Sequence, residues 1–240
     1  MKILSIGNSF SQDATRYLHR LAASAGVPIK TVNLYIGGCS LKTHYYNILE
    51  NAPAYSFEFN GESTGLKVTV KDALMSDEWD AVTLQQVSQL SPHYESYQPY
   101  LKESAAYVRR YVPHAKLYMH ETWAYEDGSE RLHNAGFEHA ADMLAGIRAS
   151  YAAAAKDIGA AGVIPCGDAM AKALENGLDK VHRDTFHATL GAGRYLLGLV
   201  WFGFFTGKPV AGIPFDAFDV PLSAEERAIV EKSAEEIVGK

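Results

Sequence analysis

The chain alternates between short, continuous apolar runs and longer stretches whose apolar residues recur three or four positions apart. The runs predict buried β-strands, and the longer stretches predict amphipathic α-helices. Five strands are expected, at residues 2–6, 29–36, 81–84, 115–120 and 162–165. Helices are expected at residues 12–24, 41–51, 71–75, 94–111, 135–158, 169–176, 190–205 and 223–238. This alternation indicates a parallel sheet with helices on both faces, joined by right-handed crossovers.

One segment departs from this rhythm. Residues 55–70 alternate apolar and polar positions with a period of two on either side of Asn60-Gly61. An Asn-Gly pair between two such runs is a strong signal for a hairpin with a two-residue turn. We therefore expect an α/β fold, a three-layer α/β/α sandwich with a flavodoxin-like five-stranded parallel sheet and a small β-hairpin inserted on the surface. Residues 1–240 show no internal repeat or linker, so a single domain is expected.

The composition restricts the partners of this fold. With 48% hydrophobic and 21% charged residues among 240, the chain can bury a sizeable core. Its 22 basic and 28 acidic residues give a net charge of −6 without a basic block, which argues against nucleic acid as a partner. The longest apolar run, residues 195–205, is too short to span a membrane. No secretory signal precedes the first strand, so a cytoplasmic protein is expected, or an exported one if a signal peptide has been removed.

Cysteines and histidines do not suggest a metal or cofactor site. Cys39 and Cys166 are the only cysteines, and neither belongs to a Cys-x-x-Cys pair. His133 and His139 lack the spacing of four residues that places two zinc ligands on one helix face. No metal and no cofactor are therefore expected.

The turn after the first strand is the leading candidate for chemistry. Gly7-Asn8-Ser9 joins the expected strand to the expected helix, which places Ser9 at the C-terminal edge of the sheet. A serine there is a candidate nucleophile, since the following helix N-terminus offers N–H groups to a developing negative charge. The alternative is that Ser9 or Ser11 only caps the helix.

Other polar residues are expected at the same edge of the sheet. Asp184 and His187 are three residues apart, so the carboxylate can orient the imidazole to accept a serine proton, although the same spacing also occurs in solvated turns. The N–H of Gly38 and the side-chain amide of Gln86 are candidate oxyanion donors. Gly38 could instead serve only a tight turn, and Gln86 could bond a loop backbone. Gln85 and Gln89 are alternatives to Gln86.

These motifs together resemble the SGNH (GDSL-type) hydrolases. Gly7-Asn8-Ser9 corresponds to the family's Gly-Asp-Ser block, residues 33–38 to the block with the second-strand glycine, and Asp184-Thr-Phe-His187 to the C-terminal Asp-x-x-His. The order and spacing cover nearly the whole chain. Two departures are Asn8 in place of the aspartate, and Leu84-Gln-Gln-Val-Ser-Gln89 in place of the Gly-x-Asn-Asp block. The resemblance implies a metal-independent serine esterase with Ser9 as nucleophile.

The expected function is hydrolysis of a small-molecule or glycan ester, with an O-acetyl carbohydrate favoured. Asn8, Trp123 and Tyr45 are expected to contact the substrate, because polar and aromatic loop residues suit stacking on sugar rings. Aromatic residues in loops can equally complete the edge of a core. The alternatives are a lysophospholipase or thioesterase, an acyltransferase with the same triad, and a non-catalytic glycan- or nucleotide-binding module on the same fold. The sequence does not predict an oligomeric state.

Overall fold

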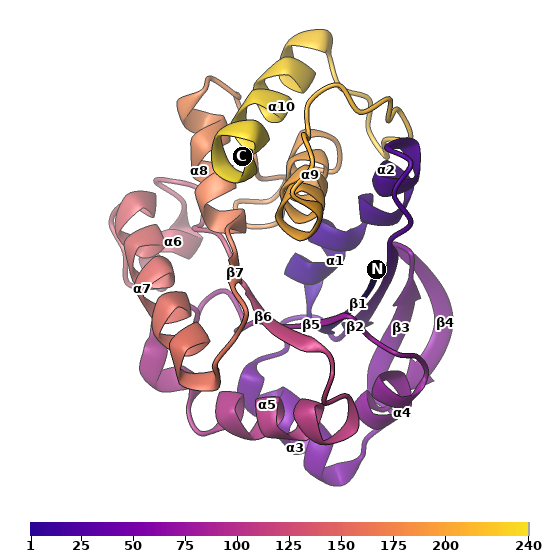
Figure 1. Cartoon of the computed structure of the whole chain (residues 1–240). Helices are drawn as coiled ribbons and strands as arrows, with labels where there is room; N and C mark the ends of the chain where they lie inside the picture. The colour runs from indigo at the N-terminus through magenta and orange to yellow at the C-terminus, as the bar shows by residue number, and fades with distance from the viewer. Residues whose placement is uncertain (240) are drawn as a thin grey trace.

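The computed structural model describes residues 1–239 and is built on a seven-stranded sheet with the order β4-β3-β2-β1-β5-β6-β7 (Figure 1). The five strands that the sequence predicts run parallel: β1 (Lys2–Gly7), β2 (Lys30–Tyr35), β5 (Ala81–Leu84), β6 (Lys116–His120) and β7 (Val163–Ile164). The α/β fold class is confirmed. Because the strands are parallel and in register, the residues that follow them gather at one edge of the sheet.

The predicted hairpin supplies the two remaining strands, β3 (Tyr55–Phe59) and β4 (Glu62–Val68). Asn60 and Gly61 between them both have positive φ, 51° and 83°, as a two-residue hairpin turn of this kind requires. β3 pairs antiparallel with β2. The hairpin therefore extends the central sheet from five strands to seven instead of lying apart on the surface, and it covers the edge that β2 would otherwise expose.

Helices form the outer layers on both faces of the sheet (Figure 1). One face is covered by α1 (Ser9–Thr15), α2 (Leu18–Ser24), α8 (Cys166–Glu175), α9 (Ala192–Thr206) and α10 (Ala224–Val238). The other is covered by α3 (Leu41–Glu50), α4 (Val70–Met75) and α5 (Tyr100–Tyr111). At the β7 end lie α6 (Glu130–Asn134) and α7 (Ala140–Ile158), and a short 3-10 helix, η1 (Tyr94–Tyr97), precedes α5.

Three of the predicted helices are shorter or broken. Residues 94–111 divide into η1 and α5 because Pro99 cannot continue a helix from the preceding turn. The helix expected from residue 135 begins at Ala140, after Gly136 with φ of 89°. The first predicted helix divides into α1 and α2 at the fully buried Tyr17, whose hydroxyl donates to the carbonyl of Leu190.

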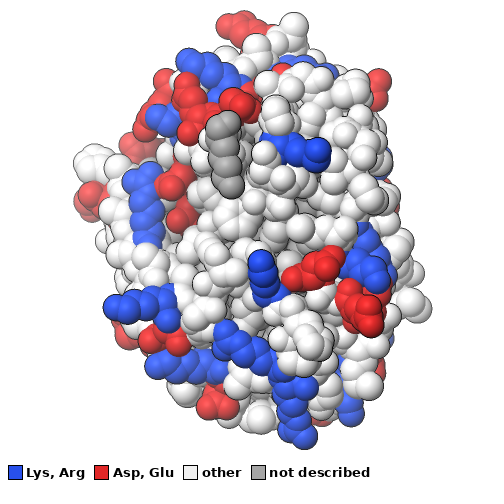
Figure 2. All heavy atoms as spheres, in the orientation of Figure 1, with Lys and Arg blue, Asp and Glu red and all other residues white. Residues whose placement is uncertain are grey.

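The core lies between the sheet and each helical layer. The side of α9 that faces the sheet is apolar and buried, and no helix within residues 1–239 combines the length and apolarity needed to cross a membrane. Figure 2 shows one face of the molecule, on which basic and acidic side chains are interspersed around a central uncharged area. Some of the opposite charges on this molecule form ion pairs. Lys2 and Lys30, for example, both contact Asp77.

Candidate active site

Ser9 occupies the first position of α1, immediately after the turn that leaves β1. Asn8 caps the helix, because its side-chain oxygen accepts the N–H of Phe10 at 3.0 Å. A Cβ on Gly7 would lie 2.3 Å from the Oγ of Ser11, so only glycine fits the turn. The tight turn leaves Ser9 half-buried at the carboxyl edge of the sheet, where the sequence predicts it.

The three residues of the predicted triad lie within hydrogen-bond distance of one another. The Ser9 Oγ is 2.8 Å from the Nε2 of His187. The Nδ1 of His187 is 2.7 Å from Asp184 Oδ2, and its backbone N–H donates to Asp184 Oδ1 at 2.9 Å. A carboxylate beside Nδ1 favours the tautomer with the proton on Nδ1, which leaves Nε2 free to accept the serine proton.

The local environment keeps Asp184 ionised. Burial raises the pKa of its carboxyl group, but the ring and backbone hydrogen bonds from His187 outweigh that effect and hold the pKa below its usual value. The carboxylate therefore stays charged at neutral pH and can stabilise a protonated imidazole.

The loop that carries Asp184 and His187 is held from several sides. The Arg183 N–H donates to the His187 carbonyl at 2.9 Å, which closes the turn, and Thr185 within it has a positive φ of 73°. The N–H of Glu126 donates to the Thr185 carbonyl at 2.8 Å, and the indole of Trp123 donates to the Phe186 carbonyl at 2.7 Å. A β-branched residue at positive φ is strained, so these contacts fix a conformation that the loop would not adopt alone.

A buried carboxylate joins this loop to α1. Asp13, one turn beyond Ser9, has a fully buried side chain and accepts hydrogen bonds from Arg183 Nη1 at 2.9 Å and Arg194 Nε at 2.8 Å. It also accepts the N–H of Ala188, the residue after His187, at 3.2 Å. Asp13 therefore connects the helix of the serine with the loop of the histidine, a role that the sequence analysis missed. In the sequence, the one signal for this role is a charged residue at the second position of the helix expected over residues 12–24.

Gly38 lies in the turn after β2, next to the Ser9 turn. The side-chain amide of Asn8 donates to the Cys39 carbonyl at 3.1 Å and so joins the two turns. Gly38 has a positive φ of 63° and is exposed. Within residues 1–239, neither the N–H of Ser9 nor that of Gly38 has an acceptor. Both donors are free to bind an anion at this edge.

Gln86 does not fit the expected role as an oxyanion donor. It is fully buried, and its Oε1 accepts the N–H groups of Leu41 at 3.0 Å and Val87 at 2.9 Å. Its amide donates to the carbonyl and hydroxyl oxygens of Ser96, both at 3.1 Å. Because both amide hydrogens are used, Gln86 holds loops together. This is the loop-backbone role that the sequence left open.

Gln85, the first alternative, is also engaged inside the protein. Its amide donates to Asn8 Oδ1 at 2.7 Å, and its Oε1 lies 2.9 Å from Nδ1 of His120. Gln85 is almost fully buried and stabilises the Ser9 turn through its bond to Asn8. Gln89 is exposed in the loop after β5 and remains the one glutamine of the three with an exposed side chain.

Of the three predicted substrate contacts, Asn8 and Trp123 are buried and Tyr45 is half-buried. Asn8 is buried, and its side chain is used by the helix cap, Gln85 and Cys39. Trp123 is fully buried and stacks on Phe10 with ring centroids 4.0 Å apart. Through its bond to Phe186 it supports, from inside the core, the loop that carries Asp184 and His187, here called the triad loop. Tyr45 is half-buried on α3 and packs against Tyr46 and Tyr100. Aromatic residues near strand ends here complete the core, the alternative that the sequence left open.

No group of three or more histidine, cysteine, aspartate or glutamate side chains within residues 1–239 is arranged to hold a metal ion. Both cysteines are buried and free.

Comparisons with known proteins agree with this architecture. The DUF4886 family, described as a domain of unknown function, matches residues 2–235. A crystal structure of a DUF4886 family protein from Bacteroides uniformis is 34% identical, with a TM-score of 0.90, and the match covers 100% of this chain and 96% of that one. No curated protein sequence matches.

More distant structures share the fold. A candidate SGNH hydrolase from Slackia heliotrinireducens is 23% identical over 84% of this chain and 97% of that one, with a TM-score of 0.61. The acetylxylan esterase from Geobacillus stearothermophilus is 15% identical over 83% of this chain and 91% of that one, with a TM-score of 0.52. The resemblance to the SGNH hydrolases is thus confirmed as a likeness of fold.

Proposed function

The chain belongs to the DUF4886 family, and we propose from the geometry of its site that it is an acyl hydrolase that uses Ser9, His187 and Asp184. The observation that carries the proposal is the continuous hydrogen-bonded series from the Ser9 hydroxyl through the His187 ring to the Asp184 carboxylate. A binding module on the same fold has no need of this arrangement, which matches the requirements of nucleophilic catalysis.

In the proposed reaction, Ser9 Oγ attacks the ester carbonyl while His187 Nε2 accepts its proton. His187 then returns the proton to the leaving alcohol, and water hydrolyses the acyl-enzyme by the same steps in reverse order. Asp184 stabilises the protonated imidazole throughout. The N–H groups of Ser9 and Gly38 bind the oxyanion, since both are unpaired and their turns are joined through Asn8.

The proposed substrate is a short acyl ester, preferably an O-acetyl group on a carbohydrate. Ser9 and His187 are half-buried, and the side chain of Asp184 is 46% exposed, so the site is open to a bulky alcohol group. Two hollows of the molecule, with volumes of about 1040 and 270 Å³, lie elsewhere: neither is lined by Ser9, Asp184 or His187. The acetylxylan esterase with the same fold acts on a substrate of this class.

The decisive experiment is intact-mass measurement after incubation with a fluorophosphonate. The wild-type protein should gain one adduct, and Ser9→Ala should gain none. Ser40→Ala is a matched control, because Ser40 is also a half-buried serine at a helix start on this edge, where it bonds Thr43 and no histidine. It should be labelled as the wild type is. Failure of folded wild-type protein to react would refute the proposal and favour the binding module.

A series of matched aryl esters with increasing acyl length tests the substrate class. Acetyl and propionyl esters should be cleaved best, because neither of the two hollows, of about 1040 and 270 Å³, extends to Ser9 to take a long acyl chain. Preference for octanoyl or longer chains would contradict the acetyl-ester proposal and favour a lysophospholipase or thioesterase.

A further inference from the structure

Arg131 is an exposed arginine that is held beside the candidate active site. Its Cζ lies 3.8 Å from the ring centroid of Phe186 and 5.8 Å from that of Tyr125. Phe186 belongs to the triad loop, and its ring centroid is 3.7 Å from that of His187. Phe186 thus contacts both Arg131 and His187, which brings a positive charge close to the histidine of the candidate site.

The charge of Arg131 is not neutralised by the protein. Within residues 1–239 its guanidinium forms no ion pair, whereas Arg16, Arg148, Arg183, Arg194 and Arg227 each pair with a carboxylate. The carboxylate of Asp184 is engaged by the His187 ring. The Glu126 side chain forms no ion pair with Arg131 within the described residues, and its backbone N–H donates to the Thr185 carbonyl. An unpaired and immobilised arginine at an active site has a charge available for a ligand.

The stacking geometry decides which kind of ligand fits. A guanidinium that stacks on an aromatic ring uses its flat face, and its N–H donors, which lie in its plane, remain available at the edge. Edge donors in a fixed fork match the two oxygens of a carboxylate. The net charge of −6 repels anions from the molecule as a whole, so a local cation is needed to bind one here.

From this arrangement we infer that Arg131 binds a carboxylate on the alcohol part of the substrate, so that the enzyme selects acyl esters of acidic sugars or related carboxylic acids. This inference rests on the proposed hydrolase function and specifies its substrate. Arg131 is a specificity determinant, and it takes no part in the bond-making steps.

Kinetics with a pair of substrates that are alike in structure and differ in charge test this inference. The pair is 4-acetoxybenzoate and its methyl ester, which differ by one negative charge. Arg131→Gln should lower kcat/KM for the anionic ester by about tenfold and leave the neutral ester nearly unchanged. Arg131→Lys should retain part of the preference, and the preference of the wild type should weaken at high salt. An equal loss on both esters, or no loss on either, would overturn the inference.

Arg110→Gln is the matched control, since Arg110 is also exposed and lies 5.8 Å from an aromatic ring centroid, that of Tyr111, but on α5. It should leave both rates unchanged. A thermal melt of each variant confirms that it is folded.

A binding measurement separates failure of this inference from failure of the hydrolase proposal. Ser9→Ala protein is titrated with both esters by NMR, with and without Arg131→Gln. Tighter binding of the anionic ester that is lost with Arg131→Gln supports the carboxylate site even if the wild type cleaves neither ester. Equal affinity for the two esters in the Ser9→Ala protein overturns the inference even if the wild type is an active hydrolase.

Discussion

At the scale of single residues, the clearest difference between expectation and structure concerns the glutamines after β5. Successive side chains of a strand point to opposite faces, so Gln85 and Gln86 could not both serve one site. The sequence shows that two amides end the strand but not which face each occupies. In the structure, the Gln85 side chain bonds Asn8 in the Ser9 turn, and the Gln86 side chain bonds Leu41 and Ser96.

We predict that Gln86→Ala lowers stability and leaves the chemistry at Ser9 nearly intact. The variant leaves the buried N–H groups of Leu41 and Val87 without their acceptor, which should reduce the free energy of unfolding by about 2–4 kcal/mol. The rate of fluorophosphonate labelling should fall by less than about tenfold, whereas losing an oxyanion donor costs about a hundredfold or more. Urea unfolding and labelling kinetics on the same samples measure both quantities.

Gln89→Ala serves as the control, because its side chain is exposed in the same loop. Its unfolding free energy should stay within about 0.5 kcal/mol of the wild type. A hundredfold slower labelling of Gln86→Ala without a change in stability would return Gln86 to the oxyanion site.

The sequence indicated in part, for a physical reason, that Ser9, Asp184 and His187 would lie near one another. Asp184 precedes His187 by three residues, so that pair is fixed by local geometry. Ser9 follows a strand and begins a helix, which places it at the right edge of the sheet, but its contact with His187 joins residues far apart in the chain. Asp13, Trp123 and Arg131 act through contacts with segments far away in the chain, and no local pattern reports such contacts.

At the scale of elements, the position of α1 relative to the loop of residues 182–188 determines whether serine and histidine meet. Asp13 is the main polar connection between them.

Element ends were less predictable than element types, because tertiary contacts decide them. The expected helix over residues 12–24 breaks at the buried Tyr17, and this break makes α1 a short, separate support for Ser9.

We predict that Asp13→Asn lowers the free energy of unfolding by about 3–5 kcal/mol, since it leaves the charges of Arg183 and Arg194 poorly compensated inside the protein. Asp219→Asn is the matched control. Asp219 also pairs with two arginines, Arg16 and Arg194, but its side chain is 21% exposed, against 0% for Asp13. Its loss should cost less, about 1–2 kcal/mol. Urea unfolding of the two variants measures the difference, and a more stable Asp13→Asn than Asp219→Asn would contradict it.

At the scale of the whole molecule, the central parallel strands could be inferred and the extent of the sheet could not. The period of each run predicted five parallel strands and a hairpin, and both are present. Whether the hairpin joins the sheet depends on β3 pairing with β2, which the sequence of neither strand specifies.

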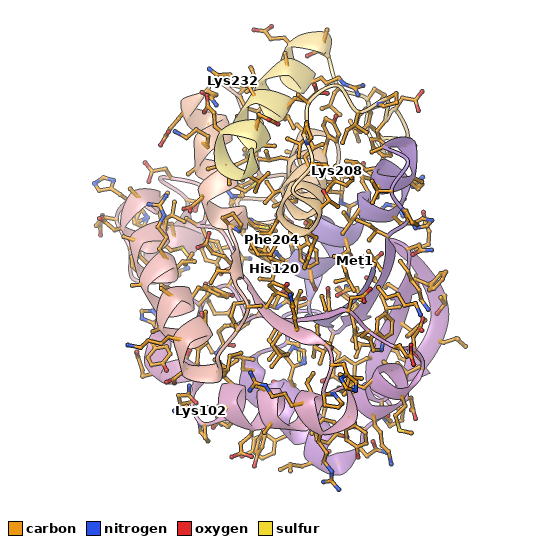
Figure 3. All side chains as sticks on the ribbon, in the orientation of Figure 1. Met1, Lys102, His120, Phe204, Lys208 and Lys232 are labelled. Carbon is orange, nitrogen blue, oxygen red and sulfur yellow. The ribbon has the colours of Figure 1, made fainter. Side chains whose placement is uncertain are left out.

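Buried titratable groups set how the stability of this molecule depends on pH. Burial lowers the pKa of His44 and His120 to about 3 and that of His182 to about 4. His120 lies inside the molecule (Figure 3), where its ring contacts Trp201 of α9. Histidines that are neutral when folded and titrate near 6.5 when unfolded make the folded state lose stability as pH falls below about 6.5.

Glu121 acts in the opposite direction. Burial, with repulsion from Asp168, raises its pKa to about 8, although Arg148 and the N–H groups of Gly167 and Asp168 favour the charged form. A carboxyl group that is protonated in the folded state and titrates near 4.3 when unfolded contributes stability at low pH, and this contribution is lost as pH rises to about 8.

The two effects together predict a maximum of stability near about pH 6.5, with a decline on either side. Above that pH the decline belongs chiefly to Glu121, at about 1.4 kcal/mol per pH unit, or about 2 kcal/mol by pH 8.

Glu121→Gln keeps an oxygen to accept the two N–H groups but cannot ionise, so it should flatten the alkaline side of the stability profile and move the maximum to higher pH. Glu50→Gln, at an exposed position without an ion pair within residues 1–239, should leave the profile unchanged. Urea unfolding from about pH 4 to 9 measures all three profiles. Parallel curves for the wild type and Glu121→Gln would mean that Glu121 is ionised in the folded protein. The alkaline decline would then have to come from another buried carboxyl, and Glu58 and Asp13, whose pKa values are also raised by burial, are the candidates.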